Sequence, residues 1–413
     1  MQDVIVIGGG VVGLTTAWWL AEAGCRVSIL ERRPQVAAGA SARNGGQLSY
    51  RYVAPLADAG VPLKALGWLF QVDGPLRFKP EADLRQYKWL SQFLANCRAD
   101  RNARTTGQLL PLGELSRQMM ATLENIVSLD DFAWRDAGKL VVYRTPKTFA
   151  HASARPASDS AQELLDPAQC VAREPALAKA EHVLAGGIFT HGEAVADCQA
   201  FCQALLQRLQ AHPRFGGVIH EEARRIVVEN GRATAITTDE AVIGADAFVL
   251  AAGIQSRNLA ATAGVCLPLY PLKGYSLTAP IRPGDQAPEI SVTDFERKVL
   301  YARIGDQLRV AAMVDMVGED ERIDQRRIDS LTRLARETMP DAADYSRLES
   351  WTGLRPATPD SAPILGPSGV GNLWLNLGQG PLGFTFACGS ARVVTDLMLG
   401  RTPPIALDGL LLR

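Results

Sequence analysis

The sequence predicts an α/β fold of two domains: a parallel-sheet domain that is discontinuous along the chain, and an α+β domain with a mostly antiparallel sheet. Three observations predict this fold. A strand, a glycine-rich turn and a helix open the chain, a second buried strand ending in glycine lies far downstream at 247–253, and alternating strand-like runs occupy 270–314. The length of 413 residues also suggests two domains.

The composition is that of an ordinary globular protein, with 47% hydrophobic and 21% charged residues. The net charge of −1 gives no reason to expect a nucleic acid partner. We expect no signal peptide, because the first strand begins at residue 3, and no transmembrane helix, because no apolar run reaches 18 residues. Seven cysteines without a CxxC pair and five scattered histidines predict reduced thiols in a cytoplasmic protein and no metal site.

The first 31 residues have the pattern of a Rossmann-like, dinucleotide-binding βαβ unit. A β-branched strand is followed by a glycine-rich turn, in which Gly8 permits the sharp bend, Gly10 lets a pyrophosphate approach the backbone and Gly13 lets the helix lie close to the strand. The N-terminus of the helix offers N–H groups to phosphates. Glu31 lies 18 residues after Gly13 and can accept hydrogen bonds from ribose hydroxyls. A glycine-rich turn without a ligand is the alternative.

A segment of small residues follows at 37–47. Glycines and small side chains let the backbone approach a flat ligand closely, so we expect a ligand-contacting loop, with a flexible surface loop as the alternative. A nicotinamide-binding Rossmann domain would continue here with another helix and strand, which this sequence does not do.

The middle of the chain alternates between helices and strands. Asp197 is placed to cap a helix, and Asn230-Gly231 between two alternating runs is a strong hairpin signal. The expected helices are 81–99, 112–126 and 198–210, and the expected strands are 138–143, 186–189, 217–220, 225–228, 233–238 and 247–253.

The last third of the chain begins with strand-rich sequence. We expect a strand at 270–277, an antiparallel pair at 298–303 and 307–314, and a charged amphipathic helix at 323–338. The glycine-dense segment 378–385 then leads from a strand into a helix expected at 387–399. Such a turn can offer backbone N–H groups to an anion or to a flavin carbonyl.

These motifs, in this order, resemble the FAD-dependent D-amino acid oxidase superfamily over essentially the whole chain. The carrying stretches are the N-terminal GxGxxG unit, Ala251-Ala252-Gly253, Gly353-Leu354-Arg355-Pro356 and Gly378-Gln379-Gly380-Pro381-Leu382-Gly383. The chain is most similar to the bacterial D-amino acid dehydrogenases of the small-subunit type, through Ala54-Pro55, Gly60–Ala65, Lys273–Thr278, Leu382–Thr385 and Ala387–Ser390.

The resemblance implies FAD, bound with its ADP half on the first βαβ unit and its flavin ring between the loops 44–48 and 378–385. Related sarcosine oxidases attach the flavin to a cysteine in the segment that corresponds to 353–359; no cysteine lies there, so we expect non-covalent FAD. The expected cofactor-contacting residues are Gly8, Gly10, Val11, Val12, Gly13, Glu31, Arg32, Arg33, Ser41, Asn44, Gly45, Gly46, Gln47, Leu48, Ala223, Arg224, Ala252, Gly253, Gly380, Pro381, Leu382, Gly383, Phe384 and Thr385.

Arg355 is the residue expected to hold the substrate. In the family, the arginine of the Gly-Leu-Arg-Pro motif binds the substrate carboxylate, and a planar guanidinium can do so bidentately. The alternative is a structural arginine paired with an acid such as Asp360. Weaker candidates for the pocket lining are Tyr275, Tyr301, Arg303 and Tyr52.

Two departures from the family pattern concern the flavin. Histidine often stands where this chain has Gln379, and oxygen-using relatives have a lysine near the flavin N5 where the strand at 308–310 has Arg309. The arginine favours a dehydrogenase over an oxidase.

The expected domains are an FAD-binding domain, 1–57, 193–270 and 345–413, and a substrate-binding domain, 58–192 and 271–344. The implied reaction transfers hydride from Cα of a D-amino acid to flavin N5 and gives an imino acid, then a 2-oxo acid and ammonia, in amino acid catabolism. Electrons would pass to a quinone or another carrier. The apolar segment 61–70 could contact the inner face of a membrane peripherally, or form an internal helix or a lid.

Other functions remain open. D-proline or D-hydroxyproline dehydrogenase and a glycine- or sarcosine-type amine oxidase are the nearest alternatives. A flavin-binding subunit of an electron-transfer complex without its own activity belongs to another class. A tRNA-modifying or regulatory nucleotide-binding protein is disfavoured by the neutral charge.

Overall fold

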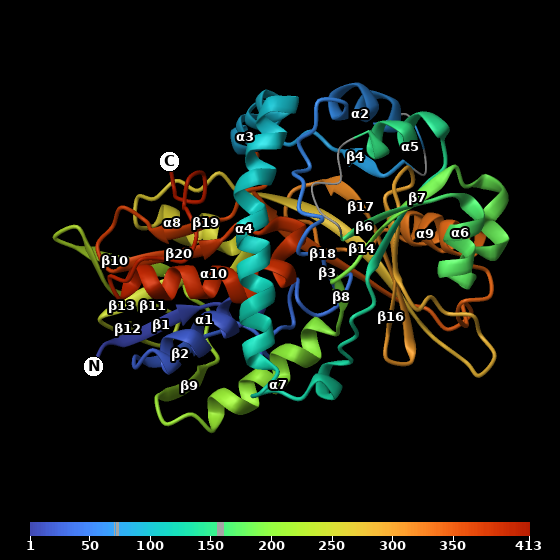
Figure 1. Cartoon of the computed structure of the whole chain (residues 1–413). Helices are drawn as coiled ribbons and strands as arrows, with labels where there is room; N and C mark the ends of the chain where they lie inside the picture. The colour runs from blue at the N-terminus through green and yellow to red at the C-terminus, as the bar shows by residue number, and fades with distance from the viewer. Residues whose placement is uncertain (70, 72–73, 155–160) are drawn as a thin grey trace.

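The structure, a computed structural model, describes residues 1–69, 71, 74–154 and 161–413. Two large sheets lie side by side, and the N- and C-termini are both on the side of the first sheet (Figure 1). The predicted α/β class, with a Rossmann-like domain and a mostly antiparallel second sheet, is confirmed.

The first sheet has six strands, and its core is parallel. Its order is β19 (Ile364–Pro367), β20 (Leu373–Leu377), β13 (Ala247–Leu250), β1 (Asp3–Ile7), β2 (Arg26–Leu30) and β9 (Phe215–Ile219), with only the edge strand β19 antiparallel to its neighbour. Val4 and Val6 of β1 enter one hydrophobic core, and Ile5 and Ile7 enter another. Because both faces of the sheet are buried, its strands read as continuous apolar runs, which is why β1 and β13 were recognisable.

Helices cover one face of this sheet. They are α1 (Val11–Glu22), α7 (Cys198–Gln210) and α10 (Gly383–Met398). The other face carries a small three-stranded sheet of β10 (Arg225–Glu229), β11 (Arg232–Thr237) and β12 (Val242–Gly244), together with α8 (Ser256–Ala261). The predicted hairpin is confirmed: Asn230 and Gly231 have φ of 50° and 74°, as the tight turn requires.

The second sheet has nine strands and is mostly antiparallel. Its order is β18 (Glu349–Ala357), β14 (Tyr270–Pro280), β17 (Gln307–Met316), β16 (Val299–Ile304), β15 (Ser291–Asp294), β5 (Lys139–Tyr143), β7 (Gly186–Thr190) and β6 (Gln162–Leu165), with β4 (Leu76–Phe78) beside β17. The helix α9 (Gln325–Thr338) buries Tyr275 and Leu277 of β14 on one face. Leu272, Gly274 and Ser276 alternate with them and border a cavity.

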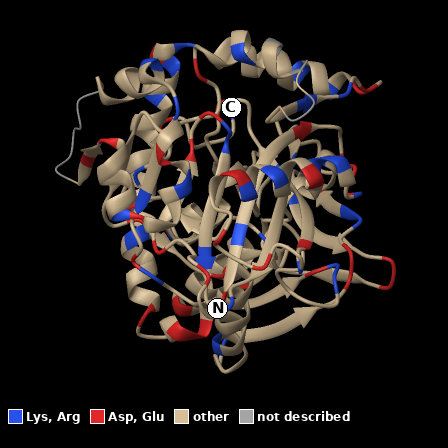
Figure 2. Ribbon diagram, turned by 90° about the vertical axis from the view of Figure 1, so that its right-hand side faces the viewer, with Lys and Arg blue, Asp and Glu red and all other residues tan. Residues whose placement is uncertain are grey.

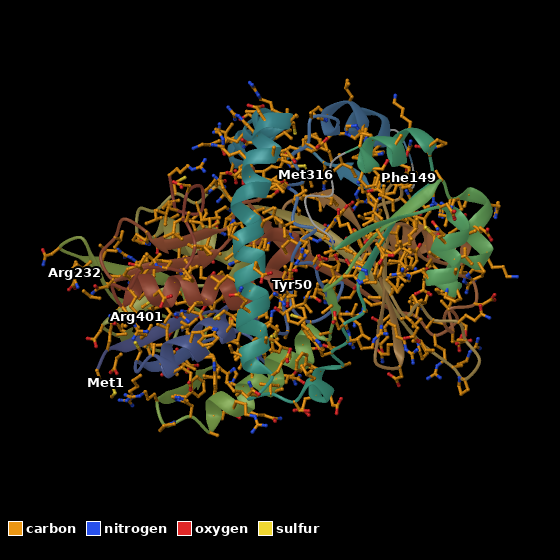
Figure 3. The ribbon with its side chains drawn as sticks, in the orientation of Figure 1. Met1, Tyr50, Phe149, Arg232, Met316 and Arg401 are labelled. Atoms are coloured by element: carbon orange, nitrogen blue, oxygen red, sulfur yellow. The ribbon has the colours of Figure 1, made fainter. Side chains whose placement is uncertain are left out.

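One long helix, α4 (Ala99–Leu123), crosses in front of the junction of the two sheets (Figure 1). The sequence predicted two separate helices at 81–99 and 112–126, but α4 runs without a break from Ala99 through Pro111, although proline usually ends a helix. Pro111 has no backbone N–H and cannot donate the usual helical hydrogen bond. The burial of Leu109, Leu112 and Leu115 in the core shared with α10 stabilises the helix in spite of this loss. Gly113 of α4 lies against the carbonyl of Tyr50, which Figure 3 shows beside the helix.

The helix after the second glycine loop also begins earlier than predicted. Residues Gly380–Leu382 form a 3-10 turn, and α10 starts at Gly383 instead of residue 387. Asp197 caps α7 as predicted, with its side chain accepting a hydrogen bond from the N–H of Ala200.

The remaining helices surround the second sheet and its junction with the first. They are α2 (Val61–Leu69), α3 (Leu84–Asn96), α5 (Pro146–Ser153) and α6 (Pro167–Arg173), and a short β3 (Gln47–Leu48) pairs with β8 (Ala194–Val195). Over the described ranges, no helix has both the length and the apolarity needed to cross a membrane. Basic and acidic residues are interspersed in the view of Figure 2.

The predicted domain boundaries stay a prediction. The strand β18 lies within the range 345–413 that the sequence assigned to the FAD-binding domain, yet it pairs along its whole length with β14 of the second sheet. It therefore carries residues such as Arg355 to the junction between the two sheets.

Candidate active site

A continuous cavity of about 1810 Å³ lies between the two sheets. The loops after β1, β2, β13 and β20 all line it, so it follows the carboxyl ends of the parallel strands, where open α/β sheets bind ligands. Its volume exceeds the roughly 300–1,000 Å³ of an ordinary small-molecule pocket. A large extended molecule and a second, smaller one can share a space of this size.

The end of the cavity near β1 fits a dinucleotide. Gly8 has φ of 111°, and a Cβ on it would lie 2.6 Å from the carbonyl oxygen of Ala251. A Cβ on Gly13 would lie 1.8 Å from the carbonyl oxygen of Gly8, so only glycine allows α1 to lie this close to β1. Gly10 is the N-cap of α1 and has no side chain, so a phosphate group can approach the backbone at the start of the helix.

Glu31 is held rigidly at the wall of this end. Its Oε2 accepts a hydrogen bond of 2.7 Å from the N–H of Gly9, and its Oε1 accepts one of 2.9 Å from the N–H of Arg33. Each carboxylate oxygen has two lone pairs, so capacity remains for ribose hydroxyls. The predicted loop at 37–47 lies opposite, where Ser41 Oγ accepts a hydrogen bond from the N–H of Val11.

Most of the predicted cofactor-contacting residues line the cavity. The ones that do not are Gly13, Leu48 and Thr385. Gly13 lies beneath the turn, Leu48 is fully buried in the core, and the Thr385 hydroxyl accepts a hydrogen bond from the N–H of Ser49. These three residues support the cavity wall from behind.

Gln379, at the departure from the family pattern, is buried against the first sheet. Its Nε2 donates a hydrogen bond of 2.7 Å to Oδ1 of Asn376. Arg309 does not line the cavity; its Nη1 donates to the carbonyl of Asn44, and burial lowers its pKa to about 10. It thus braces the loop 44–48 from the side of the second sheet.

Arg355 lines the other end of the cavity, where the two sheets meet. Its Nη1 donates a hydrogen bond of 2.9 Å to the carbonyl of Met313. The alternative partner, Asp360, instead lies 3.9 Å from Nη1 of Arg413 and accepts a hydrogen bond from the N–H of Ala362. Among the described residues, no carboxylate lies within ion-pair distance of Arg355. Its positive charge is therefore available to a ligand.

The backbone around Arg355 is shaped to receive its guanidinium. The register between β14 and β17 shifts between Lys273 and Tyr275, and Met313 in this bulge has φ of 70°, which turns its carbonyl toward Arg355. A Cβ on Gly274 would lie 2.2 Å from Nη2 of Arg355. The guanidinium thus lies directly against a strand that only glycine makes accessible.

The nearest acid to this end, Asp315, is already neutralised. It is fully buried, and its two oxygens lie 2.6 Å from Nη2 of Arg77 and from Nη2 of Arg327. Tyr275 also donates a hydrogen bond of 3.0 Å to it and lines the cavity. Burial lowers the pKa of Arg355 to about 10, against the attraction of Asp315, so the guanidinium stays charged near neutral pH.

Two of the weaker candidates do not reach the cavity. The side chains of β16 alternate, so Ala302 and Ile304 pack toward Val195, whereas Tyr301 points to α9 and donates to the carbonyl of Leu334. Arg303 is half-buried near the end of β16 and pairs with Glu289. Tyr52 does line the cavity, with its ring centroid 4.5 Å from Nζ of Lys139.

Lys139 was missed by the sequence reasoning. It is buried on β5, lines the cavity and donates hydrogen bonds of 2.7 Å to Oε1 of Gln47 and 2.9 Å to Oγ of Ser49. Burial lowers its pKa to about 8, partly offset by the attraction of Glu193. The available signal was a lysine within an otherwise apolar buried strand.

Comparisons with known proteins agree with this geometry. The family model described as "FAD dependent oxidoreductase" matches residues 3–397. The chain is 48% identical to "D-amino acid dehydrogenase 2" of Pseudomonas aeruginosa, covering 100% of this chain and 98% of that protein, and 43% identical to "D-amino acid dehydrogenase 2" of Ralstonia nicotianae, covering 98% of each.

Solved structures show the same fold. Glycine oxidase from Geobacillus kaustophilus superposes with a TM-score of 0.77 at 20% identity, covering 100% of this chain and 99% of that one. L-Proline dehydrogenase from P. horikoshii superposes with a TM-score of 0.74 at 17% identity, covering 98% and 95%.

Proposed function

Because this chain belongs to the FAD-dependent oxidoreductase family, as its whole-length match shows, we propose that it oxidises D-amino acids as a dehydrogenase. The single observation that carries the proposal is Arg355, a guanidinium without an acidic partner among the described residues at the far end of a cavity whose near end fits a dinucleotide. Relatives at 48% and 43% identity bear the name D-amino acid dehydrogenase, which supports the substrate class.

The cavity residues divide into two groups under this proposal. The turn at Gly8, the start of α1 and Glu31 would hold the ADP half of FAD, and the loops 44–48 and 380–384 would hold the flavin half. Bound FAD would supply the acceptor for the hydride from Cα of the substrate, and the imino acid product would then hydrolyse to a 2-oxo acid and ammonia. All seven cysteines are described and none lines the cavity, which supports non-covalent attachment.

Arg355 and Tyr275 perform the orientation at the substrate end. The two outer nitrogens of Arg355 can bind the α-carboxylate bidentately, while the bond to Met313 fixes the plane of the guanidinium. Holding the carboxylate in one place fixes the direction of the α-hydrogen, and orientation of this kind contributes strongly to rate. Tyr275, anchored on Asp315, closes the wall behind the guanidinium.

The electron acceptor under this proposal is a quinone or another carrier. Val61, Ala65 and Trp68 of α2 recur at one face of the helix and line the cavity, which favours a lid over the substrate end. Leu63 is 80% exposed and is the point at which a peripheral membrane contact would begin. Phe70, the end of the segment singled out in the sequence, lies outside the described residues.

The test of the proposed function is turnover with a soluble quinone analogue. Purified protein loaded with FAD should form 2-oxo acid and ammonia from D-alanine or D-methionine, and not from the L-enantiomers. Turnover restricted to L-amino acids or to N-methylglycine would contradict the proposal.

A further inference from the structure

Two lysines that the reaction above does not use face the cavity beyond Arg355. Both have their ammonium groups near the ring of Phe295, in the turn between β15 and β16: Nζ of Lys298 is 3.8 Å from the centroid of the ring, and Nζ of Lys64, on α2, is 5.7 Å from it. All three side chains line the cavity. Figure 1 shows α2 lying over the second sheet on this side of the molecule.

Two of the acids near these lysines bind other partners. Asp294 binds Nε of Arg144 at 2.6 Å, and Glu296 accepts hydrogen bonds from the N–H of Arg144 and the hydroxyl of Thr148. Within the described ranges, neither Lys64 nor Lys298 has a carboxylate within ion-pair distance.

The two positive charges therefore oppose each other in a partly dry space. Burial and the charge of Lys64 lower the pKa of Lys298 to about 8, although Glu296, Asp58 and Asp294 attract it from further away. Lys298 also has φ of 56°, a left-handed conformation that is uncommon for a lysine. A charge without a direct ion pair and backbone strain at one cavity-lining residue are typical of a binding site.

The sheet register relates the backbone of Lys298 to the strand that fixes Arg355. Arg355 donates a hydrogen bond to the carbonyl of Met313 on β17. Ala312, which precedes Met313, is paired with Val299 on β16, and Lys298 directly precedes Val299. Paired residues on neighbouring strands lie roughly 5 Å apart. The turn that carries Lys298 therefore begins one strand away from the carbonyl that fixes Arg355, and both residues line the same cavity.

The wall between the two cationic positions suits a short side chain. The ring of Phe295 packs against that of Tyr143 at an interplanar angle of 35°, with centroids 5.0 Å apart, and both line the cavity. These rings offer an apolar surface to methylene groups. Thr293, also in the lining, has a buried hydroxyl without a hydrogen-bond partner.

We propose that Lys298 and Lys64 bind a second carboxylate, so that acidic D-amino acids, with one or two methylenes between Cα and the side-chain carboxylate, are the preferred substrate class. The inference rests on the proposed function, since it assumes that Arg355 holds the α-carboxylate. A carboxylate between the two ammonium groups removes their repulsion, and a neutral side chain of the same shape does not.

The first measurement compares isosteric substrates. Reduction of the bound flavin under anaerobic conditions is followed with D-glutamate and with D-glutamine, and calorimetry compares glutarate with pentanoate, which cannot be oxidised. We expect at least tenfold better apparent affinity for D-glutamate than for D-glutamine, and for glutarate than for pentanoate. Equal or reversed preferences would overturn the inference, while bleaching by D-glutamine would leave the proposed function standing; no bleaching by any D-amino acid would overturn both.

The second measurement assigns the preference to the lysines. Lys298→Met should lower the ratio of D-glutamate to D-glutamine efficiency at least tenfold, Lys298→Arg should retain most of it, and Lys64→Met should lower it to a smaller degree. Lys179→Met removes the same charge from an exposed position outside the cavity and should leave the ratio unchanged. Parallel losses for both substrates in Lys298→Met would contradict the assignment.

Discussion

The guanidinium of Arg355 is bonded to the backbone of Met313, at the one bulge that interrupts the pairing of β14 with β17. The carbonyl uses one N–H of Arg355 and carries no full charge, so the guanidinium is fixed in direction but not neutralised. A paired structural arginine would have an acid in this place. The relationship therefore supports a carboxylate-binding role, which can be tested by changing Arg355 and by changing Gly274, against which its guanidinium lies.

Replacement of Arg355 by lysine should raise KM for a D-amino acid roughly 10- to 100-fold. Lysine retains the charge but loses the planar, bidentate fork, and a hydrogen bond to a charged group contributes about 1.5–3 kcal/mol. Steady-state kinetics with D-alanine measure the effect. Asp360→Asn, which removes the rejected partner of Arg355, is the control and should leave KM unchanged; a KM in Arg355→Lys equal to that of the wild type would exclude the carboxylate role.

Replacement of Gly274 by alanine should displace Arg355 without removing it. The new Cβ would lie 2.2 Å from Nη2, so the guanidinium must move away from β14. We expect a rise in KM similar to that of Arg355→Lys, with normal FAD content. Gly107→Ala, at a helical position where nothing lies within 4 Å of the new Cβ, is the matched control. Unchanged kinetics in Gly274→Ala would show that the position of Arg355 on β14 is not needed.

Replacement of Gly13 by alanine should abolish retention of FAD. The Cβ would meet the carbonyl oxygen of Gly8 at 1.8 Å and push α1 away from the turn that holds the pyrophosphate. The absorbance of flavin released by acid from the purified variant, compared with that from Gly107→Ala, measures the loss. Full FAD content in Gly13→Ala would place the dinucleotide elsewhere.

Local signals explain what the sequence made predictable. The turn at Asn230-Gly231, the cap at Asp197 and the glycines at 8 and 13 each depend on a few adjacent residues, and all four features are present. Arg355 was found through its motif. By contrast, Tyr301 was misplaced because strand alternation gives two faces without saying which one meets the cavity.

The missed features depend on long-range packing. The continuation of α4 through Pro111 depends on α10, more than 250 residues later in the chain. Lys139 reaches Gln47 and Ser49 only because β5 lies across from the first loop. Lys298 lies at the end of a turn, a position where a lysine side chain is ordinarily exposed to solvent.

The buried Lys139 should make stability depend on pH. Its pKa of about 8 lies below the ordinary 10.5, so the unfolded chain binds more protons than the folded chain between these values, and stability rises with pH in that window. Relative to Lys139→Met, the wild type should gain about 2 kcal/mol in unfolding free energy between pH 7 and pH 9.5. Urea titrations of both proteins at the two pH values measure the gain. A difference that does not change with pH would mean that Lys139 titrates normally.

The central claim is that one cavity brings the flavin of FAD together with a D-amino acid held by Arg355. The most direct measurement is the absorbance of the bound flavin when the purified, FAD-loaded protein is mixed without oxygen with single enantiomers of amino acids. The account predicts rapid bleaching by D-amino acids, no bleaching by the L-enantiomers, and strongly weakened bleaching in Arg355→Lys. Bleaching by L-amino acids or N-methylglycine alone would contradict it. Bleaching of the flavin in Arg355→Lys at the same D-amino acid concentrations as in the wild type would also contradict it.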